Sequence, residues 1–211
     1  MYRLYGNNGS GSAAVEIALL QCQAPFEKLD AYSTSDTPAT QALRQTNPLV
    51  QVPTLQLPDG SILTESAAIL IHLGLEFPAA GLLPDAASER AQALRGLVFI
   101  SANCYSAIGI IDYPERWLPH ADETALEQLR AGTRARLYWQ WETFADQFAD
   151  GAGMGGPVPS ALDMLAAVVS KWAGTREHLA QARPAFAALL GHLDQQPLLA
   201  RVFAEHGVFD D

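Results

Sequence analysis

Residues 47–70 constrain the fold more than any other stretch of the chain, because they combine a turn signal with the start of a helix. The Asp59-Gly60 pair lies between two short apolar runs, and this spacing predicts a β-hairpin. Pro53 has a fixed φ and no backbone donor, so we expect it at the entrance of the first hairpin strand. Residues 64–66 then open an apolar helix, whose first N–H groups are free to bind a carboxylate.

Composition and charge narrow the class of protein. The 211 residues are 49% hydrophobic and 17% charged, as in a compact protein with a sizeable core. The 13 Lys and Arg residues against 23 Asp and Glu residues give a formal net charge of −10, and no basic patch is visible. We therefore expect neither nucleic acid nor an anionic membrane surface as a partner.

The sequence also predicts a cytoplasmic location without a membrane span. The longest uncharged run, residues 96–111, is shorter than the roughly 18–20 apolar residues that span a bilayer, so a buried helix is expected there. No signal-peptide pattern opens the chain. Cys22 and Cys104 form no CxxC pair, which fits a reducing compartment.

The first third of the chain alternates between strand and helix patterns. The predicted elements are strands at 2–5, 26–31, 54–57 and 61–63 and helices at 13–21, 38–45 and 65–77. The first strand, helix and strand predict a right-handed βαβ unit. The full order, β-α-β-α-β-β-α, is that of a thioredoxin-like domain.

After residue 77 only helical patterns follow. Residues 78–87 are rich in Pro, Ala and Gly and are predicted to be a linker. Ser160 and Asp163 have the spacing of a capping box at a helix start. Helices are predicted at 89–111, 122–150, 160–173, 184–195 and 198–205. The expected fold class is α/β plus all-α: a thioredoxin-like domain at 1–77, a linker at 78–87 and a helical bundle at 88–211.

VPTL at 52–55, DG at 59–60 and TESAAI at 64–69 resemble the glutathione-binding half of the glutathione S-transferase family. The expected architecture matches that family over nearly the whole chain, whereas the specific motifs lie in the first third. The resemblance implies a cis peptide bond before Pro53, a homodimer and reduced glutathione as co-substrate. It also implies attack of the glutathione thiolate on a small hydrophobic electrophile.

The resemblance assigns glutathione-binding roles to five residues. Ser66 offers a hydroxyl and an N–H to the α-carboxylate of the γ-glutamyl end, and Glu65 accepts from the adjacent ammonium. The Val52 backbone, just before Pro53, is expected to pair antiparallel with the cysteinyl part, and Gln51 to reach the glycyl carboxylate. The structural alternative for the first pair is an ordinary helix cap with a first-turn acid.

The thiol-activating residue is expected in the loop at 6–12, where the family has a Tyr, Ser or Cys. Aligning LYG and IAL with serine-type members places Ser10 at the activating hydroxyl. The same register against bacterial beta-class members puts Gly11 where their cysteine stands, with Ser12 beside it, so this chain lacks that cysteine. Tyr5 occupies a position that many members fill without using it in catalysis. Ser10 is the predicted catalytic residue and Ser12 the alternative; in a third interpretation both only cap the helix.

The second-substrate pocket is expected to contain Asn103 and Tyr105, since Tyr105 falls where bacterial members have a polar contact residue. The alternative for Tyr105 is a core aromatic with a satisfied hydroxyl. Tyr113, Arg116 and Trp117 are candidates for one wall of the same cleft.

Two other function classes remain open on the sequence. One is a glutathione-dependent peroxidase, isomerase or disulfide reductase. The other is a non-catalytic scaffold that binds a protein partner, which the missing cysteine and the glycine-rich loop favour. The five histidines are scattered, so no metal site is predicted.

Overall fold

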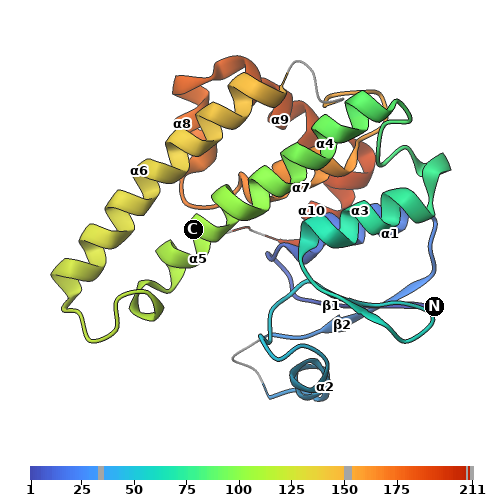
Figure 1. Cartoon of the computed structure of the whole chain (residues 1–211), viewed down its shortest axis with the longest axis horizontal. Coiled ribbons are helices and arrows are strands. Elements are labelled where there is room, and N and C mark those ends of the chain that lie inside the picture. Colours follow the sequence, from blue (N-terminus) through green and yellow to red (C-terminus); the bar gives the residue numbers. More distant parts are fainter. Residues whose placement is uncertain (33–35, 150–153, 208, 210–211) are drawn as a thin grey trace.

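A four-stranded mixed sheet forms the first part of the fold (Figure 1). The computed structural model describes residues 1–32, 36–149, 154–207 and 209. The strands are β1 (Tyr2–Gly6), β2 (Phe26–Asp30), β3 (Thr54–Gln56) and β4 (Ile62–Leu63), in the order β2-β1-β3-β4. β1 and β2 are parallel, β3 is antiparallel to β1, and β4 is antiparallel to β3. This order confirms the predicted thioredoxin-like arrangement, and the Val52-Pro53 peptide bond is cis, as the resemblance implied.

Three helices cover the two faces of this sheet. They are α1 (Ser12–Gln21), α2 (Pro38–Thr46) and α3 (Ser66–Glu76). α1 and α3 lie on the face toward the rest of the molecule, and α2 lies on the opposite face (Figure 1). Tyr5 points to the α2 side, where it packs with Ala31 and Leu43 in a small separate cluster.

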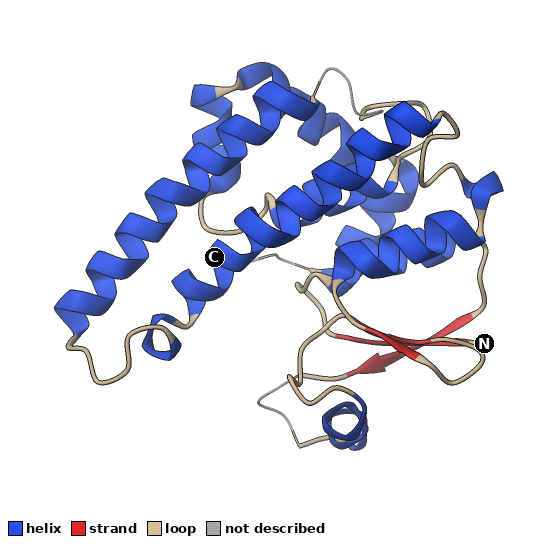
Figure 2. Ribbon diagram, in the orientation of Figure 1, coloured by secondary structure: helices blue, strands red, loops and turns tan. Residues whose placement is uncertain are grey.

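The rest of the described chain is helical, and the strands of Figure 2 are confined to the first part. A 3-10 turn at Pro78–Ala80 falls within the predicted linker. A π-helix (Ile100–Tyr105) joins the two helices that follow, and a 3-10 turn (Pro114–Arg116) comes after them. The α-helices are α4 (Ala87–Phe99), α5 (Ser106–Asp112), α6 (Glu123–Phe148), α7 (Ala161–Val169), α8 (Thr175–Ala182), α9 (Pro184–Asp194) and α10 (Pro197–His206).

Each predicted helix is present, although the one at 89–111 is divided into α4, the π-helix and α5, and α8 was missed. α8 buries only Thr175 and Leu179, so its sequence carries almost no apolar period. The helix predicted to run to residue 173 ends at Val169, and the one predicted to run to residue 150 ends at Phe148, with residue 150 itself outside the described residues. The domain boundaries at 77 and 88 stay a prediction.

The helix formed by residues 87–112 is the longest apolar one. By length and composition alone it is able to cross a membrane. Its most apolar stretch of 18 residues has a mean hydropathy of 1.5, and 39% of that stretch is buried inside the fold. A core helix of a soluble protein passes the same test, so one such helix is weak evidence for a span. In this fold it packs against α6 and α7.

α7 is the centre of the core, and all nine of its residues are buried. It packs against α1, α3, α4 and α9, so one continuous hydrophobic core extends from the sheet into the helical part. The predicted capping box is present at its start. The Ser160 hydroxyl accepts from the Asp163 N–H at 3.2 Å, and an Asp163 carboxylate oxygen accepts from the Ser160 N–H at 2.8 Å.

We expect Ser160→Ala to lower the free energy of unfolding by about 1–2 kcal/mol, because it removes the cap and a hydroxyl bonded to the buried Asp163 carboxylate. Urea denaturation measures the change. Ser106→Ala is the matched control, since the exposed Ser106 hydroxyl only donates to carbonyls of its own helical segment. Equal effects of the two substitutions would contradict the assignment of the capping box as a stabilising element.

Candidate functional site

Three segments of the first part meet at one edge of the sheet. β1 ends at Gly6 next to the start of β3, because Tyr5 is paired with Thr54. β4 ends beside the same point, since Leu63 lies opposite Leu55. The loop after β1, the residues before β3 and the start of α3 therefore adjoin one another.

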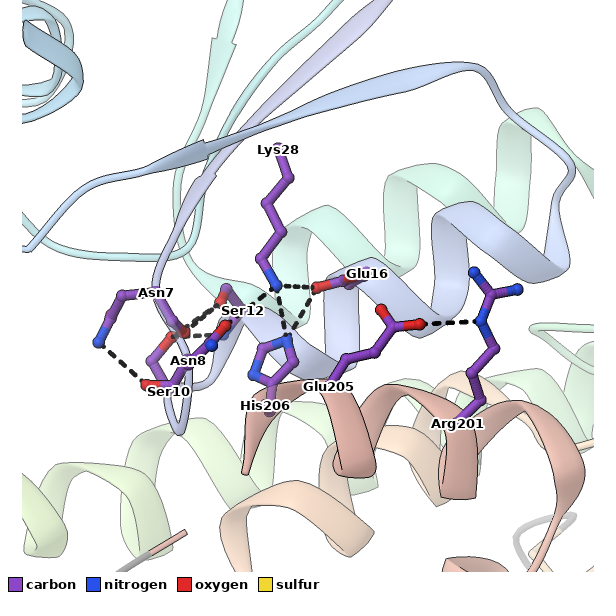
Figure 3. Close-up of polar contacts among 9 residues, drawn as sticks. All are labelled: Asn7, Asn8, Ser10, Ser12, Glu16, Lys28, Arg201, Glu205 and His206. Atoms are coloured by element: carbon purple, nitrogen blue, oxygen red, sulfur yellow. Dashed lines mark hydrogen bonds and ion pairs between the residues drawn. The ribbon is translucent and has the colours of Figure 1, made fainter. Parts of the chain in front are cut away.

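The loop after β1 holds two serine hydroxyls in one network (Figure 3). The Ser10 hydroxyl donates to the Asn7 carbonyl at 2.8 Å and lies 2.8 Å from the Ser12 hydroxyl. The Ser12 hydroxyl is 3.2 Å from the same carbonyl, and the Ser12 N–H donates to the Ser10 hydroxyl at 3.2 Å. Ser12 is wholly buried, whereas Ser10 is partly exposed. Ser12 thus provides a second donor to the Asn7 carbonyl, and Ser10 is able to redirect its proton without leaving that oxygen unpaired.

Residues 51–53 are fixed by side chains on either side. The Asn47 amide donates to the Gln51 carbonyl at 3.2 Å and to the Thr54 hydroxyl at 3.0 Å. The Thr54 hydroxyl donates to the same carbonyl at 2.8 Å. The Val52 backbone makes no hydrogen bond to another described residue, so its N–H and C=O are free to pair with an extended chain. Gln51 is exposed and Pro53 is buried.

The start of α3 is strained and uncapped. Glu65, at the N-cap, has φ 65° and ψ 109°, and no side chain caps the helix. Backbone strain of this kind at a non-glycine residue is concentrated at functional sites. Ser66 is only 5% exposed, yet its hydroxyl makes no hydrogen bond to another residue that the structure describes. The first N–H groups of α3 and this hydroxyl are therefore available to an anion.

The two predicted second-substrate residues lie in the π-helix but differ in orientation. The Asn103 amide donates to the Phe99 carbonyl at 3.1 Å, so it is turned back onto its own helix. The Tyr105 hydroxyl lies against Gly11, so close that a Cβ at that position would be 2.2 Å from its oxygen, and this places Tyr105 at the loop that carries Ser10.

Among the candidate wall residues after α5, Tyr113 contacts the thioredoxin-like part of the fold. Tyr113 is hydrogen-bonded to Tyr32, and burial together with Tyr32 raises the pKa of Tyr113. The Arg116 guanidinium lies 3.9 Å from the centre of the Tyr113 ring. Trp117 is 62% exposed. Tyr113 is thus the member of this group that connects the two parts.

A buried charged cluster, which the sequence did not indicate, lies behind the loop (Figure 3). Glu16 of α1 accepts from Lys28 of β2 at 2.8 Å and from His206 of α10 at 2.8 Å. Lys28 also reaches the Asn8 side chain at 3.4 Å. Burial opposes the charge of Glu16, but the bonds from His206 and Lys28 outweigh it, so the pKa of Glu16 lies below its ordinary value of 4.5. The cluster ties the last helix to α1 and to the loop.

We expect Glu16→Gln to destabilise the protein by about 1–3 kcal/mol at neutral pH, because Lys28 and His206 lose the negative charge of their buried acceptor. A carboxylate whose pKa is lowered in the folded state stabilises the fold at pH values above its pKa in the unfolded chain. That contribution is lost as the pH falls through the folded-state pKa. The difference between wild type and Glu16→Gln should therefore shrink on acidification, as followed by denaturant unfolding at several pH values.

Glu205→Gln is the control for this experiment, since Glu205 pairs with Arg201 on the exposed face of the same helix as His206 (Figure 3). We expect it to change stability by less than about 1 kcal/mol. A stability difference for Glu16→Gln that stays constant with pH would show that its carboxylate is not charged in the fold.

Metal ligation has no support from this geometry. In the part of the chain that the structure describes, no three His, Cys, Asp or Glu side chains are grouped so that they could hold a metal ion.

Comparisons with a family model and with a related sequence indicate the same family. The family model of the glutathione S-transferase N-terminal domain matches residues 12–75. The chain is 35% identical over 141 residues to the uncharacterized GST-like protein YncG of Escherichia coli strain K12, a match that covers 66% of this chain and 68% of YncG.

Solved structures extend the likeness to nearly the full length. A sphingomonad glutathione S-transferase, in complex with glutathione, is 25% identical with a TM-score of 0.77, covering 97% of this chain and 98% of that one. A glutathione transferase from Methylococcus capsulatus is 27% identical with a TM-score of 0.76, covering 98% of this chain and 99% of that one.

Proposed function

Because this chain belongs to the glutathione S-transferase family, we propose that it binds reduced glutathione and conjugates it to a small hydrophobic electrophile by attack of the thiolate sulfur. One observation carries the proposal: hydrogen-bonding groups from three segments gather at one edge of the sheet, and together they match an extended, zwitterionic thiol peptide. Those of Val52 and of the start of α3 have no partner among the described residues. A similar protein from a sphingomonad has been solved with glutathione bound.

The γ-glutamyl end is proposed to bind at the start of α3. The buried Ser66 hydroxyl and the free N–H groups beside it suit the α-carboxylate. The exposed Glu65 carboxylate is suited to the neighbouring ammonium. The two residues thus account for both charges of that end.

The middle of the peptide is proposed to pair with Val52. Its free N–H and C=O are held in place by the bonds that Asn47 and Thr54 make to the Gln51 carbonyl. The cis bond before the buried Pro53 is part of this arrangement. The exposed Gln51 side chain is proposed to reach the glycyl carboxylate.

The thiol is proposed to lie at Ser10, which is partly exposed at the N-terminus of α1. A thiolate there gains from the helix dipole and from a hydroxyl donor. Ser12, being wholly buried, is proposed to support Ser10 through the shared Asn7 carbonyl rather than to touch the ligand. The electrophile is proposed to sit between this loop and the segment from Asn103 to Tyr113.

Binding of reduced glutathione is the direct test. We expect saturable binding in isothermal titration calorimetry, and Ser66→Ala to weaken it about tenfold or more, as expected for loss of a hydrogen bond to a carboxylate. Ser61→Ala, in the exposed hairpin turn, should leave the affinity unchanged. No saturable binding by the wild type at several millimolar would overturn the proposed function and favour a scaffold that binds a protein partner.

Turnover tests the role of Ser10. We expect Ser10→Ala to lower the rate of conjugation to an activated chloronitroarene about tenfold and to shift its pH profile upward, because the thiolate loses a donor. Its affinity for glutathione should stay near that of the wild type. Product analysis separates conjugation from peroxidase, isomerase or disulfide-reductase chemistry, and a kinetically silent Ser10→Ala would contradict the assignment.

The proposals for the oligomeric state and the cellular location rest on the resemblance to the family. We propose a homodimer in the cytoplasm, with each glutathione site near the subunit interface. Light scattering of the purified chain measures the oligomeric state, and a monomer would contradict it.

A further inference from the structure

The Tyr105 hydroxyl fills the space that any side chain on Gly11 would need. A Cβ built on Gly11 would lie 2.2 Å from the Tyr105 hydroxyl oxygen and 3.0 Å from the ring carbon that bears it. Gly11 has φ −61°, a conformation open to every residue, so glycine is not required there by the backbone. It is required by the close approach of Tyr105.

The hydroxyl lies at the N-terminus of α1. The Gly11 N–H beside it favours the ionised phenol, although burial outweighs this effect on the pKa of Tyr105. The Tyr105 ring packs against Trp172, with ring centres 5.6 Å apart. Tyr105 is the last residue of the π-helix, an irregularity that is frequent at functional sites. The phenol has a proton to donate, and among the described residues it donates to none.

The same hydroxyl is a neutral donor rather than a base. Burial raises the pKa of Tyr105 to about 12, with the carboxylates of Asp112 and Glu65 acting in the same direction. The proton is therefore retained at neutral pH, close to the start of α1.

Ser10, by comparison, has to redirect its proton before it donates to a thiolate. Its hydroxyl donates to the Asn7 carbonyl at 2.8 Å, and Ser12 is wholly buried. Of the hydroxyls near the start of α1, only that of Tyr105 has a proton with no acceptor in the described chain. A sulfur anion placed at this helix start would meet that proton directly.

We propose that Tyr105 is a catalytic residue that donates a hydrogen bond to the glutathione thiolate, in the place where a side chain at position 11 would otherwise act. The inference rests on the proposed function. On ionisation the S–H bond breaks, the sulfur keeps the electron pair and the proton leaves to water. The Tyr105 O–H bond stays intact, and its proton is shared with the sulfur.

The test measures thiol ionisation in the complex rather than activity alone. The ultraviolet absorbance of the thiolate is followed against pH for wild type, Tyr105→Phe and Ser10→Ala, each saturated with reduced glutathione. We expect Tyr105→Phe to raise the apparent pKa of the bound thiol by roughly one unit, which leaves about tenfold less thiolate below that pKa. The dissociation constant of glutathione should change little.

Tyr138→Phe is the matched control, because the Tyr138 hydroxyl donates to the Ala173 carbonyl in the helical part. It should leave the thiol pKa unchanged. Gly11→Ala is a second variant if Tyr105→Phe does not fold, since the added methyl displaces the Tyr105 hydroxyl and should raise the thiol pKa in the same direction.

The outcomes separate the two proposals. A wild type that binds and ionises glutathione, together with an unchanged thiol pKa in Tyr105→Phe and in Gly11→Ala, overturns the role of Tyr105 and leaves the proposed function intact. A wild type that does not bind glutathione overturns both. A raised thiol pKa in either variant with a silent Tyr138→Phe supports the assignment.

Discussion

The enclosure of α1 is the constraint on which the rest of the structure depends. Eight consecutive residues, from Ser12 to Leu19, are buried, and β1, α3, α7 and α10 all pack against this helix. A helix buried on every side has no solvent face for charge. Glu16 is the exception, and its carboxylate is satisfied by Lys28 and His206, which join β2 and α10 to the same helix.

This enclosure also fixes the candidate site. The N-terminus of α1 is held by packing along the whole helix, so the loop before it is attached to a rigid element. The hydroxyls of Ser10 and Ser12 and the phenol of Tyr105 approach this point from two parts of the chain that are distant in sequence. Their geometry therefore depends on the packing of α1 against the helical part.

The sequence predicted those features whose signals are local. The hairpin at Asp59-Gly60, the order of strands and helices up to residue 77 and the Ser160–Asp163 capping box follow from neighbouring residues, and the structure confirms them. α8 was missed, because its few buried side chains leave no apolar period.

The site was only partly predictable for a similar reason. The strained backbone of Glu65 and the contact between Gly11 and Tyr105 exist only in the folded chain. The pairing of Glu16 with His206 joins the first helix to the last, and no local pattern marks it. Pairing α1 with α10 from sequence would require co-variation between distant positions.

The contact between Gly11 and Tyr105 couples these two positions in the evolution of the loop. Every residue other than glycine at position 11 carries a Cβ that collides with the phenol where it now lies, so a loop side chain displaces the Tyr105 hydroxyl unless position 105 is smaller. A lineage that acquires a side chain at position 11 therefore gives up the present place of the phenol in the same step. In such a chain Ser10 is the remaining partly exposed hydroxyl at the start of the helix, so its retention would keep a hydroxyl at the site.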